Sequence, residues 1–153
     1  MAVINVVVNG KKISREVEDS VLLSDFIRDN LALTGTHVGC DTSQCGACVV
    51  HLNGNSVKSC TTLVADCNNS EIITIEGLAS NGKMHPMQEA FKKNHGLQCG
   101  FCTPGMVMSA VDLLQKNKNP SEQEIRDWLE GNICRCTGYQ GIVAAIKDAA
   151  SKM

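Results

Sequence analysis

The chain has 153 residues, with 43% hydrophobic and 20% charged, a composition typical of a folded globular protein. Its formal net charge of −2 argues against nucleic acid as a partner. No hydrophobic run approaches the length of a membrane span, and the N-terminus lacks the basic segment and long apolar stretch of a secretory signal, so we expect a cytoplasmic protein without a transmembrane segment.

The N-terminal residues predict a β-hairpin followed by a helix. Residues 3–8 are apolar and β-branched, and residues 11–17 alternate with a polar bias. Asn9-Gly10 lies between these runs, where this dipeptide is the strongest short-range hairpin signal. Residues 20–31 then carry apolar side chains at helical spacing, which predicts an amphipathic helix.

A second hairpin and a last strand are predicted further along the chain. Residues 47–52 and 56–60 flank a turn at Asn53-Gly54, and residues 71–75 form another strand-like run. Two hairpins, a crossing helix and a final strand predict a small mixed sheet that packs on one helix.

The second half of the chain predicts helices. Pro86 stands at a first-turn position, Thr103 and Thr137 are candidate N-caps, and Ser121 with Glu124 forms a capping box. The four predicted helices cover residues 86–94, residues 104–117, the run from Ser121 to the stop at Gly131, and the run after Thr137 through Lys152.

Glycine, serine and asparagine cluster over residues 77–82, which predicts a domain boundary there. We therefore expect an α+β chain with a sheet domain over residues 1–77 and a helical domain over residues 78–153. Four short helices of this kind predict a small four-helix bundle.

Eight of the nine cysteines fall into two sets of four, and each set supplies the four thiolates that one [2Fe–2S] cluster needs. The opening Cys-x4-Cys-x2-Cys is the plant-type ferredoxin spacing. Because no export signal is visible, metal ligation is favoured over disulfides. The first quartet is Cys40, Cys45, Cys48 and Cys60, and the second quartet is Cys99, Cys102, Cys134 and Cys136.

Each quartet has a predicted local geometry. If residues 53–55 form a three-residue turn with a bulge, Cys48 directly faces Cys60 across the hairpin, and the two share one iron. In the second quartet, each cysteine pair lies just before a predicted helix, where free N–H groups and the helix dipole stabilise a negative cluster.

Other interpretations of the cysteines fit less well. Zinc sites usually pair Cys-x2-4-Cys units, which both quartets match poorly, and a thioredoxin-like role for Cys99 and Cys102 lacks a surrounding βαβ pattern. A Rieske centre needs paired histidines, whereas the four histidines are scattered. Cys67 is left over as a buried or idle thiol, and Arg135 is either a surface residue or an aid to adding an electron. No nucleophile–base or acid–base pair is visible, so we expect no catalytic residue and favour electron relay.

Three runs of the sequence carry a family resemblance. Residues 39–48, 98–105 and 131–139 resemble the iron–sulfur small subunit of molybdenum hydroxylases, the xanthine dehydrogenase family, in the same order and over essentially the whole chain. The resemblance implies an N-terminal β-grasp ferredoxin domain and a C-terminal four-helix domain. It also implies a large subunit with molybdenum on a pterin cytosine dinucleotide and a medium subunit with FAD, usually as a dimer of heterotrimers.

The resemblance further implies roles for individual residues. Gln98 and Cys136 would approach the molybdenum pterin, so the second quartet would receive electrons from molybdenum and the first quartet would pass them on to FAD. A freestanding two-cluster ferredoxin and a zinc-stapled interaction module are the alternatives from other classes.

The substrate expectation rests on two further runs. Residues 33–43 and 56–60 look most like small subunits of aerobic carbon monoxide dehydrogenase, which implies carbon monoxide as the substrate of the complex. The alternative is a relative that acts on aldehydes, purines or N-heterocycles. The residues that select the substrate lie on the large subunit.

Overall fold

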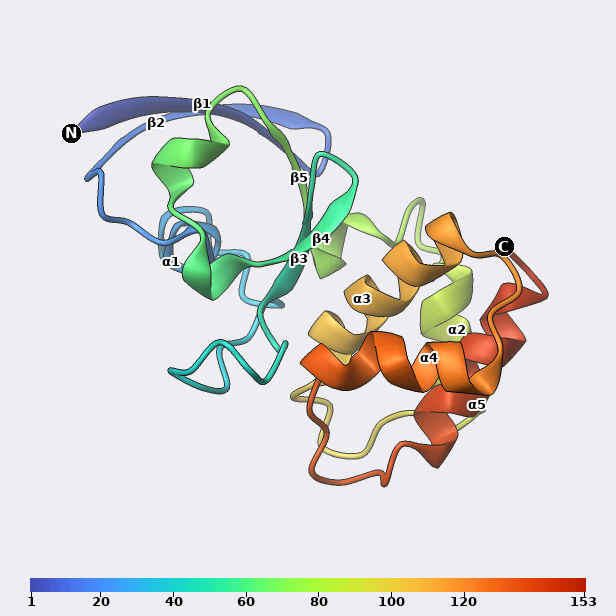
Figure 1. The fold of residues 1–153 in the computed structure, drawn as a ribbon. Helices are drawn as coiled ribbons and strands as arrows, with labels where there is room; N and C mark the ends of the chain where they lie inside the picture. The colour runs from blue at the N-terminus through green and yellow to red at the C-terminus, as the bar shows by residue number, and fades with distance from the viewer.

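The N-terminal part of the chain forms a five-stranded mixed sheet in the order β2-β1-β5-β3-β4 (Figure 1). The computed structural model describes residues 1–153. Strands β1 and β5 run parallel, and the other neighbours are antiparallel. The strands are β1 (Ala2–Val8), β2 (Lys11–Val17), β3 (Val49–Leu52), β4 (Asn55–Lys58) and β5 (Glu71–Ile73).

Both predicted hairpins are confirmed, and each turns through two residues. Asn9 and Gly10 have φ values of 50° and 79°, and Asn53 and Gly54 have φ values of 49° and 84°. Positive φ at both central residues defines the type I′ turn, whose twist suits a hairpin. The predicted three-residue turn over residues 53–55 is therefore wrong.

The predicted helix over residues 20–31 is shorter than expected. Helix α1 (Leu23–Asp25) continues as a π-helical turn (Phe26–Asn30). The chain before it is extended because Leu22 forms an isolated bridge with Leu63. The turn nevertheless packs on the sheet as predicted, since the side chains of Leu23, Phe26 and Ile27 are fully buried.

Four helices beside the sheet make up the C-terminal part of the chain (Figure 1). They form a second hydrophobic core, separate from that of the sheet. Helix α3 is the most buried of the four, with ten buried residues in succession from Gly105 to Leu114. The helices are α2 (Pro86–Lys93), α3 (Thr103–Lys116), α4 (Glu122–Trp128) and α5 (Gln140–Ala150).

The helix caps are only partly as predicted. The capping box of Ser121 and Glu124 is confirmed, and His85 with Gln88 forms another that sequence analysis missed. Cys102, not Thr103, is the N-cap residue of α3, and α5 begins after Tyr139. Thr103 and Thr137 are therefore not the N-caps of these helices.

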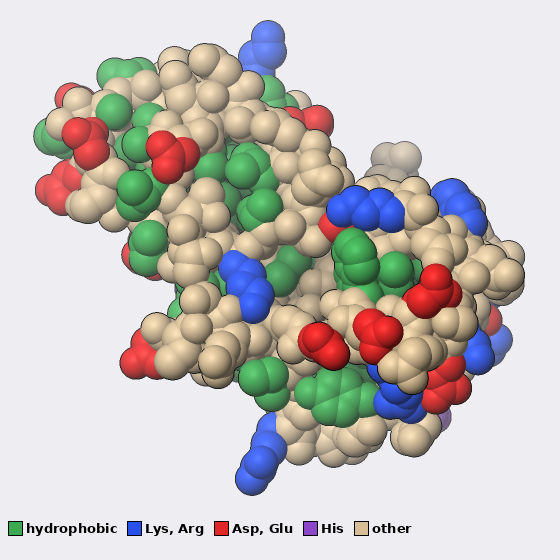
Figure 2. All heavy atoms as spheres, in the orientation of Figure 1, with side chains coloured by type: hydrophobic (Ala, Val, Ile, Leu, Met, Phe, Trp, Pro, Cys, Tyr) green, Lys and Arg blue, Asp and Glu red, His purple; other side chains and the backbone are tan.

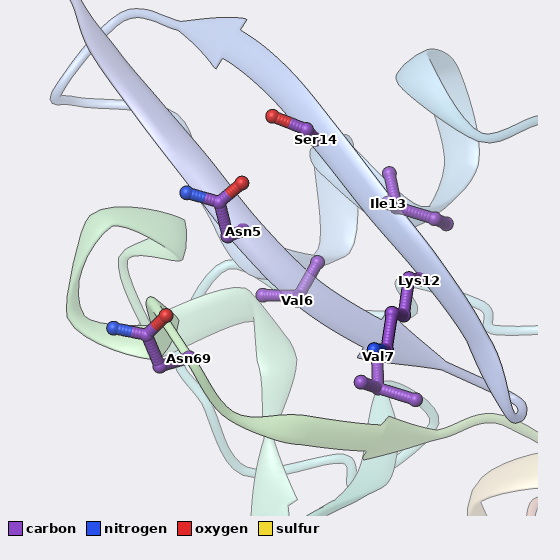
Figure 3. A pocket seen from close by; sticks show the side chains of 7 residues that line it. All are labelled: Asn5, Val6, Val7, Lys12, Ile13, Ser14 and Asn69. Atoms are coloured by element: carbon purple, nitrogen blue, oxygen red, sulfur yellow. The ribbon is translucent and has the colours of Figure 1, made fainter.

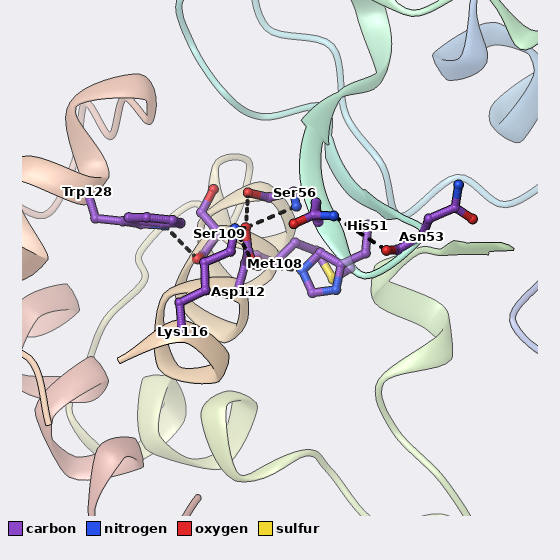
Figure 4. A network of polar contacts seen from close by, with 9 residues as sticks. His51, Asn53, Ser56, Met108, Ser109, Asp112, Lys116 and Trp128 are labelled. Carbon is purple, nitrogen blue, oxygen red and sulfur yellow. Dashed lines mark hydrogen bonds and ion pairs between the residues drawn. The ribbon is translucent and has the colours of Figure 1, made fainter. Parts of the chain in front are cut away.

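Polar contacts join the sheet to α3 (Figure 4). The buried His51 on β3 donates from Nε2 to the carbonyl of Met108 at 2.8 Å. The backbone N–H of Ser56 on β4 donates to Oδ2 of Asp112 at 3.0 Å, and its hydroxyl donates to the same oxygen. Asp112 also pairs with Lys116 at 2.9 Å, so the carboxylate is neutralised where it is buried.

No helix combines the length and the hydropathy that a bilayer crossing requires. Acidic and basic side chains are interspersed over the helical part in Figure 2, so neither charge forms a continuous patch on that face.

Candidate metal centres

The first quartet lies on one loop and at the open end of the β3–β4 hairpin. Cys40 and Cys45 are in the loop that leads toward β3, and Cys48 directly precedes β3. Cys60 follows β4 within a short 3-10 turn (Ser59–Thr61). The sheet therefore fixes two of the thiols and the loop presents the other two.

Backbone N–H groups of the loop point at its sulfurs. The N–H of Cys45 donates to Sγ of Cys40 at 3.4 Å, and the N–H of Ala47 donates to Sγ of Cys45 at 3.4 Å. The hydrogen bond from Cys45, followed by one from Thr42, lowers the pKa of the Cys40 thiol to about 6. The loop thus favours the thiolate, which is the form that binds a metal.

Cys48 and Cys60 come together in a different way from the one predicted. Val49 pairs with Lys58, so the residue opposite Cys48 is Ser59, which donates from its hydroxyl to the Cys48 carbonyl at 2.7 Å. The 3-10 turn then carries Cys60 back to the Cys48 side chain. Burial and, next, the hydrogen bond with Cys48 raise the pKa of Cys60 to about 11.

The second quartet lies on two loops of the helical part. Cys99 and Cys102 precede α3, and Cys134 and Cys136 lie in the loop that leads to α5. Sγ of Cys136 is 3.5 Å from Sγ of Cys99. Cys102 and Cys134 are the other hydrogen-bonded pair, and burial, followed by this contact, raises the pKa of Cys102 to about 12.

Thr137 and Tyr139 support the second quartet in ways that sequence analysis missed. The Thr137 hydroxyl lies 3.1 Å from Sγ of Cys134, and the Tyr139 hydroxyl accepts from the Cys134 N–H at 2.8 Å. Burial is the largest single influence on Cys134 and opposes its ionisation, but the hydrogen bonds with Thr137, Cys136 and Cys102 together outweigh burial and lower the pKa. Tyr139 has a positive φ of 69°, which is uncommon for a residue other than glycine. The run Thr137-Gly138-Tyr139 was the feature of the sequence from which this support of Cys134 could have been predicted.

The donor set fits a binuclear cluster. The thiols lie in close pairs, and no group of three or more cysteine, histidine or acidic side chains converges on a point where one ion would sit. A structural zinc site needs four ligands around a single ion, whereas a [2Fe–2S] cluster takes two thiolates on each of two irons. All eight thiols are free, and soft thiolates suit iron–sulfur clusters.

The first quartet approaches the second at a cavity of about 180 Å³. Cys45 lines this cavity together with all four cysteines of the second quartet. The N–H of Ile133 donates to the Cys45 carbonyl at 2.8 Å, and the Asn132 side chain donates to the Gly46 carbonyl at 3.2 Å. These bonds fix the two ligand loops against each other.

An aromatic stack also bridges the two loops. The rings of His37 and Phe101 lie 4.6 Å apart at an interplanar angle of 22°. Nδ1 of His37 donates to the Phe101 carbonyl at 2.7 Å. A Cβ added to Gly39 would lie 3.1 Å from the Phe101 ring, so this close approach suits glycine.

The second quartet reaches the protein surface. Cys99, Cys136, Gln98 and Arg135 are all exposed. Large hydrophobic side chains are exposed around them, which is unusual unless a partner covers them. We use the name apolar rim for four of these exposed hydrophobic residues: Val38, Leu97, Phe101 and Ile133.

The remaining candidates carry no chemistry. Cys67 is fully buried in the core of the sheet, and burial raises its pKa, as expected for an idle thiol. A shallow cavity of about 360 Å³ beside β1 and β2 is lined by Lys12 as its single ionisable side chain (Figure 3). It contains no acid–base pair.

Comparisons with known proteins agree with this arrangement. Residues 6–72 match the family described as 2Fe-2S iron-sulfur cluster binding domain, and residues 74–147 match the one described as [2Fe-2S] binding domain. The caffeine dehydrogenase subunit gamma of Pseudomonas sp. (strain CBB1) is 46% identical over 151 residues, which cover 97% of this chain and 90% of that one. The nicotine 6-hydroxylase small subunit of Paenarthrobacter nicotinovorans is 46% identical over 150 residues, with coverage of 98% and 90%.

Solved structures extend the match to the whole fold. The crystal structure of quinoline 2-oxidoreductase from Pseudomonas putida 86 matches with a TM-score of 0.95 and 39% identity, and covers 98% of this chain and 94% of that one. The aldehyde oxidoreductase from Desulfovibrio gigas matches with a TM-score of 0.94 and 44% identity, over 99% of this chain and 17% of that one.

The fold and its two thiol sites define an iron–sulfur protein of the electron-transfer class, with two [2Fe-2S] binding domains. The chain belongs to the family of small iron–sulfur subunits of molybdenum hydroxylases. It is therefore a subunit of an oxidoreductase, and its relatives work in assemblies of several subunits.

Proposed function

We propose that this chain carries single electrons from a molybdenum pterin cytosine dinucleotide centre on a large partner subunit to FAD on a medium partner subunit. The observation that carries the proposal is that Cys45 of the first quartet lines the same cavity as all four cysteines of the second quartet. A bound [2Fe–2S] cluster supplies one-electron redox chemistry at each quartet. The protein supplies the spacing between the two sites and the shielding around them.

The backbone offers a short connection between the sites. Cys45 belongs to the first quartet, and its carbonyl accepts from the N–H of Ile133 at 2.8 Å. Ile133 is covalently bonded to Cys134 of the second quartet. One hydrogen bond and one intervening residue, Ile133, therefore separate the ligand residues Cys45 and Cys134.

The thiol pairs support a specific assignment of ligands. In the second quartet, Cys99 with Cys136 would hold one iron, and Cys102 with Cys134 would hold the other, because these sulfurs are in contact. In the first quartet, the contact between Cys48 and Cys60 supports a shared iron and leaves Cys40 with Cys45 for the other.

The apolar rim is the proposed contact with the large subunit. Cys136 and Gln98 are exposed within it, so both can approach a pterin held by a partner. An apolar rim around these residues would exclude water from the interface once it is covered. We propose the same overall assembly as the resemblance implies, a dimer of heterotrimers.

We assign the two cluster sites to two domains, a β-grasp domain over residues 1–77 and a four-helix domain over residues 78–153. Two separate hydrophobic cores support this division. Each small domain would gain stability from its metal cluster.

The substrate of the complex is proposed to be an N-heterocycle, with an aldehyde as the second candidate. Relatives named for caffeine and nicotine, and a structure named for quinoline, support the first choice. The aldehyde oxidoreductase iron-sulfur-binding subunit PaoA of Escherichia coli (strain K12), which is 45% identical over 161 residues, supports the second. These relatives favour either choice over carbon monoxide.

The test is to purify the chain with its native partners and measure metals, flavin and reduction by substrate. The proposal expects about four iron atoms per chain, together with molybdenum and FAD in constant ratio. Anaerobic quinoline should bleach the visible absorption of the clusters, whereas carbon monoxide should not. Iron without molybdenum or a large partner would instead favour the freestanding ferredoxin.

A further inference from the structure

We propose that the side-chain ammonium of Lys58 raises the reduction potential of the cluster held by the first quartet. The inference rests on the proposed binding of a [2Fe–2S] cluster by that quartet. It assigns a role to a side chain that is not a ligand and lies on none of the three motif runs.

Lys58 lies close to the first quartet both along the chain and through a hydrogen bond. It is the last residue of β4, two positions before Cys60, and its ammonium donates to the carbonyl of Ser43. Ser43 lies between the ligands Cys40 and Cys45 and has a positive φ of 56°. The side chain therefore reaches back from the hairpin to the ligand loop and holds its charge against it.

The backbone of Lys58 is held as firmly as its side chain. The hydroxyls of Thr61 and Thr62 both donate to the Lys58 carbonyl, at 3.0 Å and 3.1 Å. These bonds stabilise the turn that presents Cys60. Lys58 thus connects the ligand loop to the last ligand of the quartet.

The charge of Lys58 has no carboxylate partner. None of the ion pairs in the structure includes it, although other lysines are paired, such as Lys116 with Asp112. Its side chain is half-buried beside Gly131 at the junction with the helical part. An unpaired ammonium in such a place keeps more of its electrostatic influence than an exposed one, because water screens it less.

A cation at this position favours the reduced state of the first site. Reduction adds one electron and increases the negative charge of the thiolate-bound cluster by one unit. The fixed ammonium stabilises that added charge, and nearby charge and hydrogen bonding are established determinants of cluster potentials. An electron from the second site would therefore be drawn toward the first site.

The experiment compares reduction potentials in the full chain with both clusters bound, by a titration with dithionite and mediators that is followed by EPR. Lys58→Met should lower the equilibrium constant for reducing the first cluster about tenfold, which is about 59 mV for a one-electron couple. Lys58→Arg should stay close to the wild type. The potential of the second cluster should change much less.

Lys12→Met is the matched control, because Lys12 lies on β2, at the opposite edge of the sheet from β4. If Lys58→Met does not retain the cluster of the first quartet, the same titration is made with Lys58→Gln. This variant keeps an N–H donor but removes the charge. An unchanged first-cluster potential, or an equal shift in Lys12→Met, overturns the inference. A wild-type chain without iron or visible absorption would overturn the proposed function instead.

Discussion

At the scale of single residues, function depends on which thiols lie together. Cys136 is exposed and touches Cys99, whereas Cys67 is buried among apolar side chains in the core of the sheet. The environment of a cysteine, rather than its presence, therefore decides whether it serves a cluster.

The first prediction separates these two kinds of cysteine. Cys136→Ser should lose the cluster of the second quartet, because a hydroxyl replaces one of four thiolates. Cys67→Ala should retain both clusters and lose about 1 kcal/mol of stability for the small cavity. Iron content and EPR of the purified chains measure both outcomes. Equal iron in the two variants would contradict the ligand assignment.

The second prediction concerns the buried carboxylate of Asp112. Burial opposes its ionisation, but hydrogen bonds from Ser56 and Lys116 outweigh that cost and lower its pKa. A lowered folded pKa contributes stability above the unfolded value of about 3.9, and this contribution is lost as the pH falls through the folded pKa. Asp112→Asn should therefore destabilise the chain at pH 7 by about 1–3 kcal/mol.

The free energy of unfolding in urea, measured from neutral to acidic pH, checks this result. The gap between Asp112→Asn and the wild type should narrow below about pH 4. Asp127→Asn, at an exposed carboxylate, is the control and should change little. A gap that is absent at pH 7 or constant with pH would refute the role of Asp112.

At the scale of elements, α3 connects the two sites. Its N-cap is Cys102 of the second quartet, and its middle binds β3 through His51 and β4 through Ser56 (Figure 4). Strand β3 begins directly after Cys48, and strand β4 ends two residues before Cys60. The same contacts that hold the sheet to the helices therefore also set the relation of the two quartets.

The sequence predicted both hairpins and all four helices of the C-terminal part. These features depend on local signals, such as Asn-Gly turns and helical periodicity. It did not predict the register of the β3–β4 hairpin, because a turn of two or three residues shifts every pair by one. Cys60 still contacts Cys48 because a 3-10 turn follows β4. No local pattern in the sequence predicted that turn.

The caps of α3 and α5 were mispredicted for a related reason. A threonine before a helical run is a common N-cap, but Thr137 is engaged by Cys134 and Tyr139 instead. The contact between Cys45 and Ile133 joins residues 88 positions apart in the sequence, so it follows only from the packing of the two parts.

The third prediction uses two glycines with similar backbones. Gly46 has a φ of 71°, and a Cβ there would lie 2.3 Å from the Gly131 carbonyl, whereas Gly10 has a φ of 79° and open space. Gly10→Ala should lower the free energy of unfolding by about 1–2 kcal/mol, for the positive φ alone. Gly46→Ala should lower it by more and should weaken binding of the cluster by the first quartet, because the ligand loop must move. Urea unfolding and iron retention compare them, and equal costs would argue against close packing of the loops.

At the scale of the whole molecule, the apolar rim marks the side that we propose a partner covers. The side chain of Phe101 is 48% exposed, yet it lies beside the ligand Cys102 and stacks on His37. A hydrophobic ring held rigidly at the surface is typical of an interface anchor.

The fourth prediction tests this surface. Phe101→Ser should weaken capture of the large subunit at least about tenfold, as expected for an interface residue that contributes about 1.4 kcal/mol or more. Val3→Ser is the control, because Val3 is 58% exposed on β1 and outside the rim. Dissociation constants from co-purified or reconstituted complexes measure the effect. Equal affinities for both variants would place the interface elsewhere.

The measurement that tests the central claim most directly is EPR of the full chain after reduction with dithionite. Two quartets that each hold a [2Fe–2S] cluster predict two distinct signals of equal intensity, together about two spins per chain. A single signal, or a colourless chain that contains zinc in place of iron, would contradict the account.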